Sequence, residues 1–109
     1  MSIFANKQCE SETSRLTDDD IKRHLPEISS EWKLAKDGKS ISRTFKFKNY
    51  HDTMAFVNVV AMVAHQQDHH PEMIVTYNTC RVEFSTHSVD GLSLNDFICA
   101  AKVDGTLNI

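Results

Sequence analysis

The sequence is poor in the residues that build phosphate loops, zinc pairs and disulfide frameworks. Its 109 residues include only three glycines, two prolines and three cysteines. With so little glycine there is no phosphate loop and no dinucleotide-binding fingerprint. The cysteines are odd in number and widely spaced, so neither a CxxC zinc pair nor a disulfide framework can be read. They are Cys9, Cys80 and Cys99.

Charge of one sign and long apolar runs are also lacking. The net charge is −3, so no large basic field attracts nucleic acid or anionic lipid. Residues 1–16 contain no apolar run long enough for a signal peptide or a membrane span. We expect neither a nucleic-acid nor a membrane partner. The cysteine usage favours a reducing, cytoplasmic setting.

Length and patterning indicate one domain with an α+β order of elements. A chain of this size fits a single domain, which we place at residues 17–109 after a polar N-terminal arm over residues 1–16. Capping signals and apolar periodicity predict the order helix, two strands, helix, two strands, helix. The expected elements are helices over 17–25, 51–67 and 94–102, a hairpin around Asp37-Gly38, and strands over 73–77 and 80–84. The hairpin turn would pair Leu34 with Ile41 and Trp32 with Arg43.

The second strand pair gives a register that matters for function. A tight turn at Asn78-Thr79 would pair Tyr77 with Cys80 and would place the apolar residues of both strands on one face. Continuing this ladder outward brings His70 opposite His87. A bulge would shift that pairing by one residue.

Histidine is the residue that stands out. Asp68-His69-His70-Pro71 lies where the long helix must stop, since a proline disfavours helical geometry in the residue before it. Imidazole exchanges protons near neutral pH. The register argument brings His69, His70 and His87 together, with Asp68 or Asp96 able to orient a ring. Such a group suits an elimination, in which one residue protonates a leaving hydroxyl and another removes a proton.

Each of these residues also has a simpler explanation. His65 and His69 are four apart and could bind a metal, although Gln66 stands where a zinc protease motif needs glutamate. Histidines at a helix C-terminus can complement the dipole. Asp96 occupies the third position of a capping box begun by Ser93 and could serve the helix alone. Elsewhere, Tyr77 and Cys80 are expected in the core, and His24 and His51 on the surface.

The combined pattern resembles a known family. Asp68-His69-His70-Pro71-Glu72, Tyr77, Ser85-Thr86-His87, Gly91-Leu92-Ser93 and Asp96 are similar in type and spacing to the pterin-4a-carbinolamine dehydratases. The resemblance runs from about residue 17 to residue 102 and is closest in the second half. Two positions depart from the family pattern. His65 stands where an acid is common, and Met73 stands where a tryptophan is common.

The resemblance implies a fold, a reaction and a set of site residues. The fold would be a four-stranded antiparallel sheet with helices packed on one face. The reaction would be dehydration of 4a-hydroxytetrahydropterin to quinonoid dihydropterin plus water, in tetrahydrobiopterin recycling, with no cofactor and no metal. His69 and His87 would be the acid and base, and His70 would bind and orient the pterin. The residues implied around the substrate are Asp68, His69, His70, Ser85, Thr86, His87, Ser88 and Asp96.

Two expectations concern partners. The broad apolar character of the helix over 51–67, together with the resemblance, predicts a homodimer or homotetramer. Some members of the family also bind a homeodomain transcription factor as a dimerisation cofactor. A protein-interaction module with the same fold is therefore the alternative to an enzyme.

Overall fold

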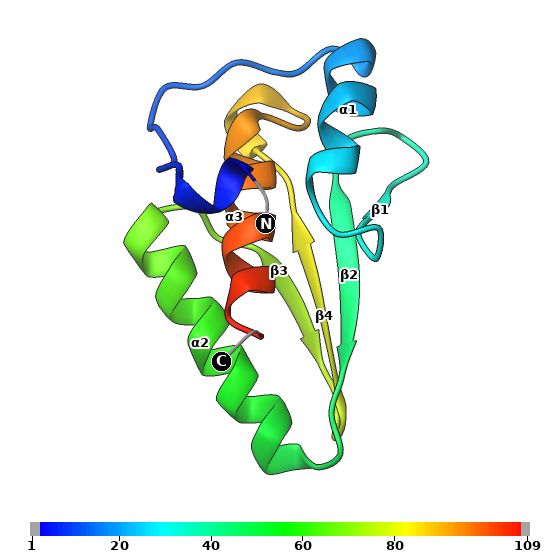
Figure 1. Ribbon diagram of the computed structural model, residues 1–109, viewed down its shortest axis with the longest axis vertical. Coiled ribbons are helices and arrows are strands. Elements are labelled where there is room, and N and C mark those ends of the chain that lie inside the picture. The colour runs from blue at the N-terminus through cyan, green and yellow to red at the C-terminus, as the bar shows by residue number, and fades with distance from the viewer. Residues whose placement is uncertain (1–2, 108–109) are drawn as a thin grey trace.

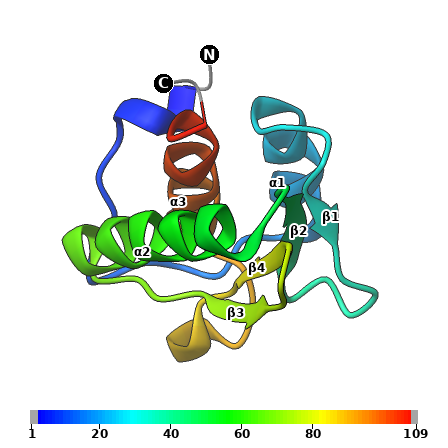
Figure 2. The ribbon, with the colours of Figure 1, turned by 90° about the horizontal axis from the view of Figure 1, so that it is seen from below.

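The computed structural model describes residues 3–107 and has three helices and a four-stranded antiparallel sheet in the order predicted from the sequence (Figure 1). The three helices lie on one face of the sheet, which leaves the other face open (Figure 2). The helices are α1 (Asp18–His24), α2 (Tyr50–Gln67) and α3 (Leu94–Gly105), and the strands are β1 (Lys33–Leu34), β2 (Ile41–Lys46), β3 (Glu72–Val75) and β4 (Thr79–Phe84). Short 3₁₀ turns are η1 (Ile3–Asn6), η2 (Leu25–Glu27) and η3 (His87–Val89).

The helix starts follow the capping signals. Thr17 and Asp20 form a reciprocal capping box at the start of α1, and Asn49 caps α2 by accepting a hydrogen bond from the Asp52 amide. Asp96 accepts from the amide of Ser93 at the start of α3. α3 runs three residues further than expected, to Gly105. Local side-chain chemistry therefore determines where the helices begin.

The first hairpin has the predicted register. Leu34 pairs with Ile41, and the turn between them uses Gly38 with a positive φ of 72°, a conformation that glycine adopts without steric cost. The outermost pairing expected from this hairpin, Trp32 with Arg43, lies beyond the two residues of β1. Trp32 Nε1 and Arg43 Nη1 instead donate to the two carboxylate oxygens of Asp104 on α3, both at 2.8 Å. These bonds connect the sheet to the helical layer.

The core lies between the sheet and the helices. Cys80 is buried as predicted. Two predictions about aromatic residues were wrong. Tyr77 is 63% exposed and stacks on Tyr50 at the tip of the hairpin. His24 is half-buried, and its ring contacts Phe4 and Phe97. The fully buried large side chains are Phe4, Phe84, Phe97, Ile41, Leu92, Val60, Val82 and Val103.

β4 is central in the sheet, whose strand order is β1-β2-β4-β3. Its inner face is fully buried through Cys80, Val82 and Phe84. The upper end of β4 in Figure 1 leads into η3 and then into the start of α3. None of the helices within residues 3–107 has the length and apolar character needed to cross a membrane.

The register of the β3–β4 hairpin differs from the prediction by two residues. Val75, not Tyr77, pairs with Cys80, and Met73 pairs with Val82. The amide of Thr76 donates to the carbonyl of Thr79, and the two hydroxyls are also hydrogen-bonded, so the chain turns at residues 77–78. Because the shift is an even number of residues, the apolar residues stay on one face. The predicted pairing of His70 with His87 is lost.

Candidate active site

The C-terminus of α2 delivers His69 to the site. Asp68 adopts a left-handed conformation, with φ of 50°, directly after Gln67. The amide of His69 then donates to the carbonyl of Ala64 at 3.1 Å, a closure typical of helix C-termini. The helix ends at Gln67 as predicted, but the chain turns away at Asp68, three residues before the proline to which the sequence analysis attributed the stop. This reversal directs the His69 side chain to the first turn of α3.

Asp96 is the centre of the site. It is fully buried, and each of its two oxygens has a partner. Oδ1 lies 2.6 Å from Nε2 of His69, while Oδ2 accepts from the hydroxyl of Thr86 at 2.8 Å and from the amide of Ser93 at 2.9 Å. Asp96 therefore both caps α3 and binds an imidazole, so the two roles considered from the sequence coexist.

His69 is held on two sides and is largely withdrawn from solvent. Its side chain is 12% exposed, and its ring stacks on Phe84 with a centroid distance of 6.1 Å and an interplanar angle of 10°. Burial acts to lower the pKa of His69, but the hydrogen bond and charge of Asp96 outweigh burial and raise that pKa. Thiolate character at Cys9 and the charge of Asp68 act in the same direction.

This geometry determines which atoms are available for chemistry. The raised pKa favours the imidazolium form, which donates from Nε2 to Asp96. Because Nε2 is engaged in this way, a proton exchanged with a substrate must pass through Nδ1. The orientation and the charge of the His69 ring are therefore set by a buried carboxylate.

Thr86 and Gly91 place the segment that carries His87. The amide of Thr86 donates to the carbonyl of Gly91 at 2.8 Å, which closes a loop around η3. His87 is the first residue of η3 and is exposed, as is Ser88. His87 therefore comes directly after Thr86, whose hydroxyl donates to Asp96.

Most of the remaining predicted site residues lie on the surface, next in sequence to His69 or Thr86. Asp68, His70 and Ser85 are exposed. Thr86, by contrast, is buried, and its hydroxyl also lies 2.6 Å from that of Ser93. The structure therefore brings His69, Thr86 and Asp96 into direct contact and gives exposed positions to the other predicted residues.

Three residues at or beside the site were not predicted as part of it. Ser93 contributes its amide to Asp96, and the capping-box pattern could have indicated this bond. Phe84 supplies the surface for the His69 ring, which the alternation of the strand could have indicated. Cys9, from the N-terminal arm, has no comparable signal, because its neighbours on α3 are about 90 residues away in the sequence.

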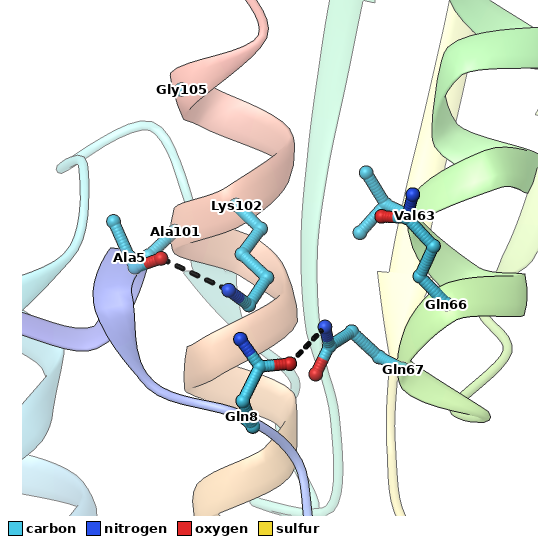
Figure 3. A pocket seen from close by; sticks show the side chains of 8 residues that line it. All are labelled: Ala5, Gln8, Val63, Gln66, Gln67, Ala101, Lys102 and Gly105. Atoms are coloured by element: carbon cyan, nitrogen blue, oxygen red, sulfur yellow. Dashed lines mark hydrogen bonds between the residues drawn. The ribbon is translucent and has the colours of Figure 1, made fainter.

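A metal site of the kind considered for His65 and His69 needs several ligand side chains close together. Within residues 3–107 no group of three or more His, Cys, Asp or Glu side chains is arranged to hold a metal ion. A hollow of about 440 Å³ lies between the N-terminal arm, α2 and α3 and is lined by residues that include Gln8, Gln67 and Lys102 (Figure 3). No histidine lines this hollow.

Comparison with known proteins shows which family the chain belongs to. The family model for pterin 4 alpha carbinolamine dehydratase matches residues 14–106. The chain belongs to the pterin-4a-carbinolamine dehydratase family. A dehydratase of this family is a hydro-lyase that acts on a pterin, and the α+β fold with its four-stranded sheet agrees with the family resemblance.

Individual relatives cover nearly the whole chain. A protein of Nitrosomonas eutropha, named as a candidate pterin-4-alpha-carbinolamine dehydratase, is 56% identical over 98 residues, which are 90% of this chain and 85% of that protein. A candidate of the same name from Legionella pneumophila is 46% identical over 101 residues, 93% of this chain and 89% of that one. The crystal structure of a transcriptional coactivator/pterin dehydratase from Brucella melitensis superposes with a TM-score of 0.79 at 32% identity, covering 84% of this chain and 97% of that one.

Proposed function

We propose that this dehydratase removes water from 4a-hydroxytetrahydropterin by histidine acid/base catalysis and so serves tetrahydrobiopterin recycling. The observation that carries the proposal is the hydrogen bond that His69 makes to the buried carboxylate of Asp96. A buried carboxylate beside a shielded imidazole keeps that ring protonated and fixes its direction. An acid of this kind is what loss of a hydroxyl group requires.

The proposed reaction uses one proton donor and one proton acceptor. His69, charged and oriented by Asp96, protonates the 4a hydroxyl through Nδ1, and the C–O bond breaks as water leaves. His87 accepts the proton from the neighbouring ring nitrogen, and a C=N bond forms to give the quinonoid dihydropterin. No redox step or group transfer is involved. Each positioned acid or base contributes roughly 10²–10⁴-fold to the rate.

The other candidate residues bind the pterin in this proposal. His70 orients the ring from the exposed segment between α2 and β3, and Asp68, Ser85 and Ser88 are exposed for hydrogen bonding. Thr86 acts through Asp96, because its hydroxyl is already bonded to the carboxylate. The two departures from the family pattern lie outside these contacts. His65 is exposed on α2, and Met73 is half-buried on β3.

A stopped-flow assay with 4a-hydroxytetrahydropterin tests the proposal. We expect His69→Ala and His87→Ala each to lower kcat by roughly 10²–10⁴-fold, and His70→Ala chiefly to raise KM. The matched control is His51→Ala, whose exposed ring lies at the opposite end of α2. Dehydration at the wild-type rate in the His87→Ala variant would show that the histidine mechanism is wrong.

We further propose that the enzyme is a homo-oligomer in a reducing cytoplasm. Met62 is 61% exposed and Val59 is 37% exposed on α2, and burying such side chains against a second copy would be favourable. All three cysteines are free thiols, as a reducing compartment maintains them. The same face of α2 would serve the alternative function, a protein partner. His87→Ala separates the two, because it removes dehydration and leaves assembly intact.

A further inference from the structure

The N-terminal arm brings Cys9 against α3, the helix that carries Asp96. Cys9 lies between η1 and α1, outside any helix or strand, whereas Cys99 is fully buried in the middle of α3. Their sulfur atoms are 3.4 Å apart. A disulfide bond is about 2.05 Å long, so the two sulfurs would have to approach by only roughly 1.4 Å.

The arm is anchored by Phe4, which is buried in the core, and around Cys9 the irregular chain is held by hydrogen bonds that involve side chains, including two between Glu10 and Asn95. The amide of Cys9 donates to Oε1 of Gln67 at 2.8 Å, and Gln67 Nε2 donates to Oε1 of Gln8 at 2.8 Å (Figure 3). Lys102 Nζ donates to the carbonyl of Ala5 at 3.0 Å in the same view. An irregular segment held in this way can shift by about an ångström more easily than a helix, so Cys9 is the partner that moves.

The two thiols have unequal reactivity. The hydrogen bond with Cys99 lowers the pKa of the Cys9 thiol, although burial raises it, and the cations of His69 and Lys102 lower it further. Its hydrogen bond to Cys9 and its burial raise the pKa of Cys99. Because the thiolate is the nucleophile, Cys9 reacts first, and Cys99 is positioned to react with the product.

We propose that Cys9 and Cys99 are a reversible thiol-oxidation site, in which a peroxide oxidises Cys9 and Cys99 closes the disulfide that fastens the N-terminal arm to α3. This inference is independent of the proposed dehydration mechanism. It is carried by the distance between the two sulfurs, by the partial exposure of Cys9 and by its position on an irregular segment.

The chemistry balances in two steps. The Cys9 thiolate attacks one oxygen of hydrogen peroxide, the S–O bond forms, the O–O bond breaks, and the departing hydroxide takes a proton to become water. The sulfur of Cys99 then attacks the sulfenic sulfur of Cys9, the S–S bond forms, and the second oxygen leaves as water with the thiol proton. The cysteines lose two electrons, which the peroxide accepts. A dithiol reductant reverses the change.

The site joins parts of the chain that also form the active site. Cys99 follows Asp96 by three residues, one turn along α3, and the Cys9 thiol also contacts the carbonyl of Asn95 at 3.6 Å. Closing the disulfide therefore fixes the arm against the helix that holds the His69–Asp96 pair. Removing thiolate character from Cys9 also removes a negative charge that raises the pKa of His69.

Treatment of the full chain with hydrogen peroxide followed by mass spectrometry tests the proposal. We expect a monomer about 2 Da lighter, a Cys9–Cys99 linked peptide, and recovery of the original mass with dithiothreitol. We expect Cys9 to react at least about tenfold faster than Cys80, which is fully buried. Cys80→Ala keeps the pair and should behave like wild type, whereas Cys9→Ser should give no linked peptide.

The outcomes that contradict the proposal are equally specific. Accumulation of sulfinic acid on Cys9 without a linked peptide, or a disulfide between two copies through Cys9, would overturn it. Equal reaction of all three cysteines would also overturn it. Because Cys99→Ala affects a buried helix, Cys9→Ser is the decisive variant. A second measurement is tryptic cleavage at Lys7 and Arg15, which should slow in the oxidised wild type and not in peroxide-treated Cys9→Ser.

Discussion

His69 and Asp96 are joined by a 2.6 Å contact between Nε2 and a carboxylate oxygen, and none of the Asp96 side chain is exposed to solvent. The two residues are 27 positions apart and come from the end of one helix and the start of another. Their contact connects the packing of α2 and α3 to the charge of a proposed catalytic ring. Charge and stability are therefore coupled at this position.

The first prediction concerns stability and pH. Because the folded pKa of His69 is raised, its contribution is fully present below the unfolded pKa of about 6.5 and is lost as the pH rises through the folded pKa. Urea unfolding at pH 6 and pH 9 should show this loss in wild type and much less of it in His69→Gln. His51→Gln, at an exposed position, should retain it. An identical pH dependence in wild type and His69→Gln would contradict the assignment.

The second prediction concerns Thr86. Thr86→Val keeps the shape of the side chain and removes the hydroxyl that donates to Asp96. Loss of a hydrogen bond to a buried charged group should destabilise the fold by roughly 1.5–3 kcal/mol, measured by urea unfolding. The control is Thr44→Val on the open face of the sheet, which should change stability by no more than about 0.5 kcal/mol. Equal effects of the two substitutions would show that the hydroxyl contributes nothing special.

The third prediction uses the left-handed conformation of Asp68. With φ at 50°, glycine is accommodated without steric cost, whereas a side chain with Cβ costs roughly 1–2 kcal/mol. Asp68→Gly should therefore be at least as stable as wild type and clearly more stable than Asp68→Ala in thermal unfolding. If Asp68→Ala were the more stable of the two, the helix would not end as described.

The fourth prediction addresses metal dependence. Proton transfer between histidines needs no metal ion, so dialysis against a chelator should leave dehydration at the wild-type rate. The readout is stopped-flow turnover before and after dialysis, with readdition of Zn²⁺ as the control. A loss that zinc restores would support the reading of His65 and His69 as metal ligands.

The fifth prediction concerns assembly. Met62→Lys places a charge on the exposed apolar face of α2 and should shift the mass in light scattering towards the monomer at micromolar concentration. Ser30→Lys adds the same charge at an exposed loop position and should leave the mass unchanged. A wild-type protein of monomer mass would contradict the proposed oligomer.

Local signals predicted most of the fold. The caps at Thr17, Asn49 and Ser93 act within four residues, so the sequence nearby is sufficient to place the helix starts. The Asp37-Gly38 turn gave the correct register for the same reason. The register of the second hairpin was wrong by two residues, because the turn contains Tyr77 and Asn78 and is closed by hydrogen bonds between Thr76 and Thr79.

The candidate site was predicted in its residue types and only partly in its contacts. Histidine chemistry and spacing selected His69, His87 and Asp96 as candidates. The structure brings His69 and Asp96 into contact, whereas the register that placed His87 opposite His70 was wrong. The bond between His69 and Asp96 depends on how α2 and α3 pack, which no local pattern specifies. The pairing of Cys9 with Cys99 spans 90 residues and is determined by tertiary structure alone.

The position of β4 has a consequence for synthesis of the chain on the ribosome. β4 pairs with β2 on one side and with β3 on the other, yet its last residue, Phe84, follows the end of β2 at Lys46 by 38 residues. At about 5–20 residues per second, β2 emerges roughly 2–8 seconds before its partner is complete. During that interval the nascent chain carries an unpaired strand edge, and a chaperone that binds extended segments would have its opportunity there.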